Sequence, residues 1–225
     1  EVIKGPQSTL YGTQALGGVV NILTKDPANT PTISADVYGT STREGSINLA
    51  ASPEIGRFKG FVSGNAVRME HYVDENDDGF ADQAKRSRLA LFGKGRLPGT
   101  NGEMRLNVAA KLYAEDRTGG PPNFTDDLRG SDEVYGESIY TRRAELLTEY
   151  RPSGLGERLR LRGALTYHNQ DSYYGPEHYV GTQKIAFGQA TWSQSVTEWM
   201  DLLMGASARY DMYDDNTPAT TVADR

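Results

Sequence analysis

Apolar and polar residues alternate strictly along several segments that follow Lys25. The pattern is clearest in the segments 103–115 (EMRLNVAAKLYAE), 158–169 (RLRLRGALTYHN) and 201–211 (DLLMGASARYD). In the first of these, Leu106 and Leu112 fall on one face of an extended chain, whereas Asn107 and Lys111 fall on the other. A period of two predicts β-strands with one apolar and one polar face. The runs exceed the length of about 5–6 residues that is usual for strands of globular proteins.

The connections between the alternating segments are of two kinds. Short turns with glycine or proline are predicted at 52–57, 97–102 and 151–157, and a less clear one at 193–199. Longer polar loops are predicted near 70–86, 115–137 and 171–183. Short turns that alternate with long loops indicate an up-and-down antiparallel meander of about nine strands after Lys25.

Two classes of all-β protein have this pattern. A soluble β-sandwich also alternates apolar and polar residues along its strands. Outer-membrane barrels combine long strands, short periplasmic turns, long extracellular loops and a polar interior. The strand length and the unequal connections favour the second class. The predicted fold class is therefore all-β, a partial antiparallel up-and-down transmembrane β-barrel.

Composition and charge narrow the function classes. The chain has 225 residues, of which 37% are hydrophobic, and its formal net charge is −6. Its mean hydropathy is −0.60. The chain contains no cysteine, which excludes thiol catalysis, disulfides and thiolate zinc sites. Nucleic-acid binding is not expected, because recognition of phosphates needs a basic surface. No serine-hydrolase or zinc-protease motif is present, so we do not expect an enzyme.

The stretch 5–25 (GPQSTLYGTQALGGVVNILTK) is rich in glycine and ends in an apolar run. A phosphate-binding loop needs a lysine followed by serine or threonine directly after its second glycine, and a dinucleotide fingerprint needs G-x-G-x-x-G before a helix. Neither spacing is present, and the glycines precede a predicted strand. The stretch is therefore not interpreted as a phosphate-binding loop.

The slightly longer segment 1–27 (EVIKGPQSTLYGTQALGGVVNILTKDP) resembles the end of the plug domain of TonB-dependent outer-membrane receptors. Looser resemblance continues in the segments 114–123, 130–143, 187–192 and 208–220. Glycines suit a plug whose backbone packs closely against a barrel wall. The positions that match the plug pattern are Glu1, Val2, Lys4, Gly5, Pro6, Leu10, Tyr11, Gly12, Gly17, Gly18, Val20, Asn21, Ile22, Thr24 and Lys25.

The resemblance implies a plug inside a barrel of 22 strands, which 225 residues are too few to build. We therefore expect an internal fragment. Residues 1–27 would be the C-terminal end of the plug domain, and residues 28–225 would form the first roughly nine strands of the transmembrane barrel. The N-terminal box that recruits the TonB–ExbB–ExbD system would lie outside this segment.

The same resemblance implies location and function. The protein would lie in the lipid of the outer membrane of a Gram-negative bacterium, and the looser segments resemble receptors from Bacteroidota. It would take up a scarce small-molecule nutrient, vitamin B12 or a ferric siderophore, with energy relayed from the inner membrane; haem is a third candidate. The alternative from another class is a secreted calcium-binding β-sandwich or adhesin.

An acidic loop at 74–82 (DENDDGFAD) is a candidate metal site. Calcium is coordinated by six to eight oxygens, and D-x-[DN]-x-D-G directs three side-chain oxygens to one centre around a sharp turn. The loop is no EF-hand, because Lys85 stands where the bidentate glutamate would be. A solvated acidic loop remains the alternative. The predicted calcium ligands are Asp74, Asn76, Asp78 and Asp82.

The resemblance adds that vitamin B12 receptors of this family order extracellular loops with calcium. The segment 76–80 is similar to their calcium-binding segment, although Asn76 replaces a carboxylate. A second acidic cluster would add ligands if its loop folded beside the first. It comprises Asp126, Asp127, Asp132 and Glu133.

Three other groups of residues have both a general and a specific interpretation. The histidines would be solvated or contact substrate, or else be haem ligands. The tyrosines would form an interfacial girdle or line a ligand site. The arginines would give the barrel lumen its polarity or bind an anionic siderophore. These residues are His71, His168, His178, Tyr113, Tyr140, Tyr167, Tyr173, Tyr174, Tyr179, Tyr210, Tyr213, Arg142, Arg143, Arg158, Arg160 and Arg162.

Overall fold

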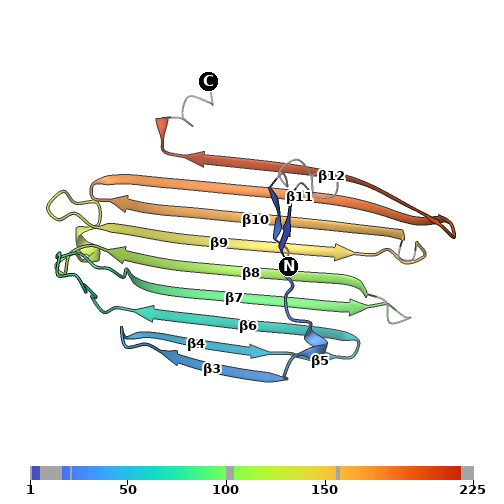
Figure 1. Ribbon diagram of the computed structural model, residues 1–225, viewed down its shortest axis with the longest axis horizontal. Coiled ribbons are helices and arrows are strands. Elements are labelled where there is room, and N and C mark those ends of the chain that lie inside the picture. The colour runs from blue at the N-terminus through green and yellow to red at the C-terminus, as the bar shows by residue number, and fades with distance from the viewer. Residues whose placement is uncertain (1, 6–16, 21, 100–103, 156–157, 219–225) are drawn as a thin grey trace.

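A single large antiparallel sheet makes up most of the computed structural model (Figure 1). The structure describes residues 2–5, 17–20, 22–99, 104–155 and 158–218. Most of the plug-like stretch, residues 6–16 and 21, lies outside the described residues. The all-β prediction is confirmed: neighbours in the sheet follow the order β12-β11-β10-β9-β8-β7-β6-β4-β3, with the short β5 beside β6.

The sheet is a meander in which each long strand pairs with the next one along the chain. A separate two-stranded sheet lies near the N-terminus, and two short 3-10 helices complete the elements. The strands and helices are β1 (Val2–Lys4), β2 (Gly18–Val20), η1 (Pro27–Asn29), β3 (Ile33–Gly39), β4 (Glu44–Ala51), β5 (Glu54–Ile55), β6 (Phe58–Met69), β7 (Lys85–Pro98), β8 (Met104–Gly119), η2 (Asp126–Leu128), β9 (Glu137–Tyr150), β10 (Leu159–Tyr174), β11 (Glu177–Thr197) and β12 (Met200–Asp215).

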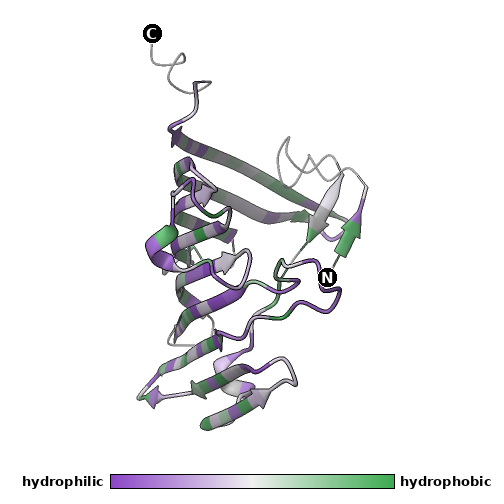
Figure 2. Ribbon diagram, turned by 90° about the vertical axis from the view of Figure 1, so that its left-hand side faces the viewer, coloured by the Kyte–Doolittle hydropathy of each residue, from purple (hydrophilic) through white to green (hydrophobic). Residues whose placement is uncertain are grey.

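The register aligns the apolar positions of neighbouring strands on one face. Leu112 of β8 lies opposite Leu91 of β7 and Ala144 of β9. Further along the sheet, Leu165 of β10 lies opposite Leu146 of β9 and Ala186 of β11. We call this the apolar face, and the opposite one the polar face. Figure 2 shows the alternation as hydrophobic and hydrophilic bands along the strands.

The apolar face is uncovered. Among the described residues, the buried hydrophobic side chains are only Phe61, Val67, Met69 and Phe124. Leu112 and Leu165, at the middle of their strands, are 54% and 55% exposed. A β-sandwich would cover such a face with a second sheet about 10 Å away, and no described element packs there along the length of the strands. The sandwich alternative is therefore not favoured.

The two ends of the sheet carry different connections. Long connections join β6 to β7 and β8 to β9, and short ones join the strands at the other end. The predicted long loop near 171–183 is wrong, because β10 continues to Tyr174 and β11 begins at Glu177. Gly175 has a φ of +59° and is followed by proline, so a two-residue turn suffices despite the polar composition around it.

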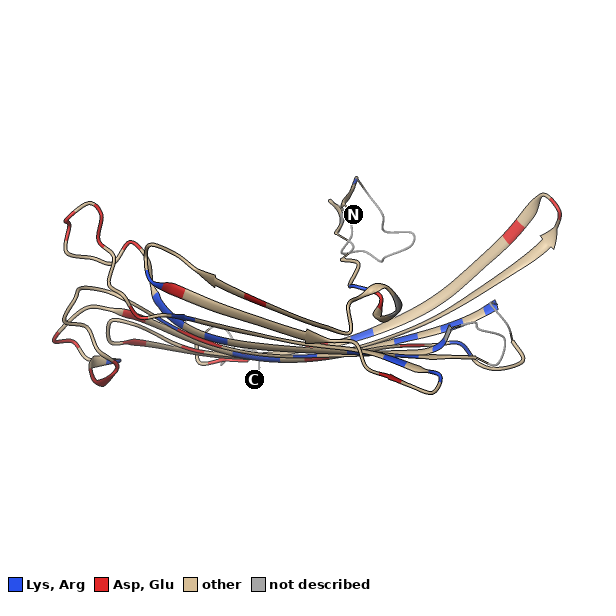
Figure 3. Cartoon of the chain, turned by 90° about the horizontal axis from the view of Figure 1, so that it is seen from below, with Lys and Arg blue, Asp and Glu red and all other residues tan. Residues whose placement is uncertain are grey.

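The N-terminal segment lies over the concave side of the sheet, which is its polar face (Figure 3). The Lys94 ammonium donates to the Thr24 hydroxyl at 2.9 Å, and Arg96 forms an ion pair with Asp26 at 2.9 Å. The polar face is thus the one that meets the plug-like segment. Among the described residues, no helix is long and apolar enough to cross a membrane.

Candidate functional site

Several charged residues of the strands lie toward the end with the long loops (Figure 3), and the register places a ladder of them on the polar face. Arg88 of β7 and Arg117 of β8 approach the Glu115 carboxylate at 3.9 and 3.8 Å. Neighbouring ion pairs join Arg86 to Glu44 and Arg143 to Glu145. Because Glu115 has two guanidinium partners, the ladder holds one more positive than negative charge.

A second charged cluster lies on the same face near the short turns. The Glu149 carboxylate of β9 forms ion pairs with the guanidinium groups of Arg151, Arg160 and Arg162, at 3.3, 3.6 and 2.9 Å. The predicted placement of Arg160 and Arg162 on the polar face is therefore found, and Glu149 partly neutralises them.

Adjacent residues of a strand face opposite sides, and this separates Arg142 from Arg143. Arg142 pairs with Asp116 at 2.6 Å on the apolar side of the sheet, beyond the apolar residues. The expectation that both arginines face the lumen is wrong for Arg142, because Arg142 lies on the same face of β9 as Ala144 and Leu146.

The tyrosines divide between the two faces in the same way. Tyr113, Tyr179 and Tyr213 lie on the polar face, and the hydroxyls of the last two are in contact. Those on the apolar side are Tyr140, Tyr167, Tyr173 and Tyr210. The tyrosines thus lie on both faces of the sheet, and the two expected roles, a girdle and a ligand-facing set, stay predictions.

The acidic loop between β6 and β7 is a tight turn closed by its own side chains. The Asp74 carboxylate accepts the Gly79 N–H at 2.9 Å and the Tyr72 hydroxyl at 3.1 Å. Asp78 accepts the Phe80 N–H at 2.8 Å, and Asp82 accepts the Glu75 N–H at 2.6 Å. Gly79 has a φ of +84°, which a glycine adopts at low cost.

The loop keeps Asp74 ionised. Desolvation acts to raise the pKa of the Asp74 carboxyl, but hydrogen bonds from Gly79, Tyr72 and Asp78 outweigh it and lower that pKa. The stabilisation that these bonds give is present above the ordinary pKa of the carboxyl and is lost as pH falls through the lowered value. At neutral pH the turn is therefore held by an anionic Asp74.

The four predicted ligands lie in this one turn, but most of their oxygens face backbone N–H groups. Among the described residues, no three Asp, Glu or His side chains form a group that could hold a metal ion. The second acidic loop lies beside the first, since Ala81 donates its N–H to Gly120 O at 3.1 Å and the Phe80 and Tyr135 rings are 6.3 Å apart. The two loops are thus neighbours without a joint carboxylate group.

Sequence reasoning missed a cluster centred on Arg129, in the β8–β9 connection. The Arg129 guanidinium lies between two rings, 4.1 Å from the Tyr140 centroid and 4.5 Å from the Tyr173 centroid. It donates to Ser138 Oγ and to Asp171 Oδ1, both at 2.8 Å. These partners lie on two strands, β9 and β10, that are distant from Arg129 or from each other in the sequence, so no spacing in the sequence pointed to them.

His178 extends the cluster. Its ring stacks on Tyr173 at 4.2 Å, and its Nε2 lies 3.0 Å from Asp171 Oδ1. Two elements thereby anchor the β8–β9 connection, β10 through Asp171 and Tyr173 and β9 through Tyr140. His178 is thus occupied by contacts within the protein, whereas His168 lies on the polar face.

Comparisons with known proteins give partial matches, and no protein-family model matches the chain. The pesticin receptor of Yersinia pestis is 34% identical over 79 residues, which is 34% of this chain and 11% of that receptor. The iron-regulated outer membrane virulence protein of Vibrio cholerae is 28% identical over 134 residues, 52% of this chain and 18% of that protein. The chain thus spans less than a fifth of these curated relatives.

A solved structure matches most of the chain. The siderophore receptor PiuA from Acinetobacter baumannii aligns with a TM-score of 0.63 and 13% identity, over 95% of this chain and 35% of that one. At this identity the match shows the fold. Together with the sequence relatives it supports the resemblance to TonB-dependent receptors, and none of these proteins is named as an enzyme. The expected Bacteroidota source finds no support, because the relatives come from Yersinia, Vibrio and Acinetobacter.

Proposed function

We propose that the chain is part of a TonB-dependent outer-membrane receptor for a ferric siderophore. The observation that carries the proposal is the single-layer sheet, with an uncovered apolar face and a charged concave face. A lipid bilayer would cover such an apolar face, and the charged face would line a polar barrel lumen. The relatives named as iron-regulated or siderophore proteins favour iron over cobalamin.

Residues 1–27 would be the end of the plug, and their contacts with the sheet support this assignment. Two polar contacts join it to β7, Lys94 with Thr24 and Arg96 with Asp26. Exposed ion pairs contribute about 0.2–1 kcal/mol each. Contacts of this strength would let the plug end move when the TonB–ExbB–ExbD system pulls on the plug from the periplasm.

The charge of the polar face favours an anionic substrate. The surplus positive charge around Glu115 and the phenol of Tyr113 lie near the long loops, which face the outside in barrels of this kind. Guanidinium groups and phenols suit an anionic iron chelate with oxygen donors. Vitamin B12 is the second candidate, favoured by the acidic loop.

Replacement of Arg117 tests the substrate proposal in the full-length receptor. Arg117→Gln removes the surplus charge and leaves Glu115 paired with Arg88. We expect the affinity for an anionic ferric siderophore to fall about tenfold, or ~1.4 kcal/mol, measured by binding of labelled iron chelate to whole cells. Arg142→Gln, on the apolar side, is the control and should bind as the wild type does. Cells that take up labelled cobalamin but no iron chelate would refute the assignment.

We propose calcium as the structural ion of the acidic loop, with Asp74, Asn76, Asp78 and Asp82 as ligands. The donors are hard oxygens around one turn, as calcium requires. Asp78→Asn should weaken calcium protection of the loop against proteolysis at least tenfold. The adjacent Asp77→Asn should leave it unchanged, because Asp77 is outside the ligand pattern and asparagine tolerates its φ of +57°. Equal effects of the two substitutions would argue against the site.

A further inference from the structure

The polar face has a second cluster of arginines, near the short turns of the sheet. Arg160 and Arg162 of β10 approach the Glu149 carboxylate with Nε, and Arg151 approaches it with Nη2. These four side chains, which we call the Glu149 cluster, together carry a charge of +2. Short turns face the periplasm in outer-membrane barrels, so the cluster would lie at the inner end of the lumen.

Two guanidinium groups of the cluster remain open to the lumen. The Glu149 side chain is 18% exposed, whereas those of Arg160 and Arg162 are 36% and 43% exposed. A guanidinium has five N–H donors, and both arginines approach Glu149 with Nε. Their terminal amino groups are therefore left for a second anion, and planar guanidinium groups suit an anion with paired oxygens.

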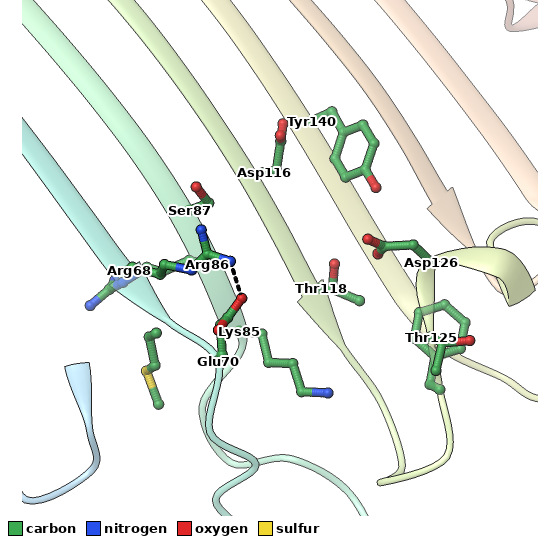
Figure 4. A pocket seen from close by; sticks show the side chains of 12 residues that line it. Arg68, Glu70, Lys85, Arg86, Ser87, Asp116, Thr118, Thr125, Asp126 and Tyr140 are labelled. Carbon is green, nitrogen blue, oxygen red and sulfur yellow. Dashed lines mark hydrogen bonds and ion pairs between the residues drawn. The ribbon is translucent and has the colours of Figure 1, made fainter. Parts of the chain in front are cut away.

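The charged pocket at the other end of the sheet differs from this cluster. This pocket of about 410 Å³ at Lys85 opens beside the long loops, between the strands β6 to β9 and the β8–β9 connection (Figure 4). Arg68 lines the pocket and has the Glu70 carboxylate beside it. One guanidinium there has one carboxylate, whereas three guanidinium groups share one carboxylate in the Glu149 cluster. The cluster is thus the stronger attractor of an anion.

An apolar row on the polar face separates the Glu149 cluster from the ladder around Glu115. Along β8, Glu115 is eight positions from Asn107, the residue opposite Glu149, which corresponds to about 26 Å. The two groups of charges are therefore too far apart to hold one small anion together. The row between them consists, from β8 to β11, of Ala109, Leu147, Ala164 and Phe187.

A carboxylate from outside the sheet is already bound at the level of the Glu149 cluster. Asp26 of the plug-like segment pairs with Arg96 of β7 at 2.9 Å. Arg96 lies in one register row with Glu149, two strands away, or about 10 Å at the usual spacing of strands. Arg162 is the next member of that row. Arginines at this level can thus bind a carboxylate that comes from the lumen.

We propose that the Glu149 cluster is a second binding site for an anionic iron chelate, which the chelate occupies before it leaves the lumen for the periplasm. The terminal amino groups of Arg160 and Arg162 would donate hydrogen bonds to oxygens of the chelate. The Glu149 carboxylate would weaken this binding by repulsion, as release from the site requires. The inference rests on the proposed siderophore function and adds to it a site that is separate from the ladder around Glu115.

The test is equilibrium binding of iron-labelled ferric citrate, a small anionic chelate, to the purified full-length receptor in detergent. We expect two classes of site, a stronger one that Arg117→Gln weakens and a weaker one that it leaves unchanged. Arg162→Gln should weaken the second class about tenfold, because it removes a charge-assisted contact. Glu149→Gln should strengthen the second class several-fold, because it removes the repulsion. Arg142→Gln, on the apolar side, should change neither class.

The opposite signs separate binding from a purely structural role. If the cluster only held β9 against β10, Arg162→Gln and Glu149→Gln would break the same ion pair and act in the same direction, which would overturn the proposal. A single class of sites that depends on Arg117 would also overturn it, as expected if a carboxylate of the plug filled the cluster; the siderophore function would then stand. Loss of the first class with the second retained would count against the siderophore function and leave the cluster as an anion site.

Discussion

Leu165→Arg is expected to destabilise the full-length receptor in lipid vesicles, lowering its free energy of unfolding by about 2–4 kcal/mol. Leu165 lies at the middle of β10 on the apolar face, between Leu146 and Ala186. A guanidinium at this position would have to lose its water in the hydrocarbon of the bilayer. Urea titration of the receptor refolded in vesicles measures the change.

The control is the neighbouring residue, which faces the other way. Thr166 lies opposite Glu145 and Ile185 on the polar face. Thr166→Arg introduces the same side chain into an aqueous lumen beside a carboxylate, so we expect a change of less than about 1 kcal/mol. If both substitutions cost the same, the apolar face does not meet lipid, and the proposed membrane placement is wrong.

Arg129→Ala is expected to lower the free energy of opening of the β8–β9 connection by about 2–3 kcal/mol. It removes two cation–π contacts, worth ~0.5–1 kcal/mol each at exposed sites, and a charge-assisted pair with Asp171. It also leaves the hydroxyl of Ser138, a residue that is only 1% exposed, without its donor. Hydrogen exchange of residues 120–136, read by mass spectrometry, reports this opening.

Arg142→Ala provides the matched comparison. Arg142 also pairs with an aspartate on this side of the sheet, but both side chains are close to half exposed. Its loss should cost less than about 1 kcal/mol. Arg129→Lys should recover only part of the loss, because an ammonium does not stack between two rings as a planar guanidinium does. Unchanged exchange in Arg129→Ala would mean that other contacts hold the connection.

The fold could be predicted to the level of individual strands because the alternation has one physical cause. The segments 103–115, 158–169 and 201–211 fall largely within β8, β10 and β12. In a sheet with one apolar face, a register slip of one residue would reverse every side chain. Composition was a poorer guide at 171–183. Its polar residues predicted a long loop, but a glycine and a proline join β10 to β11 in a two-residue turn.

The site was less accessible to sequence reasoning than the fold. The turn formed by Asp74 and Gly79 is local, and its spacing is visible in the sequence. The contacts of Arg129 reach as far along the chain as Tyr173, and they depend on how one loop lies against the sheet. The pocket at Lys85 likewise requires four strands and a loop to meet, so only the folded arrangement reveals it.

The meander also bears on how the chain folds. Every pair of adjacent long strands is joined by one local connection, the longest of which runs from Gly119 to Glu137. The entropy of closing a loop grows only slowly with its length, and local contacts speed folding. The hairpins can therefore form in chain order, each on the edge left by the one before. A substitution that blocks one hairpin would then delay the strands that follow it and spare those already paired.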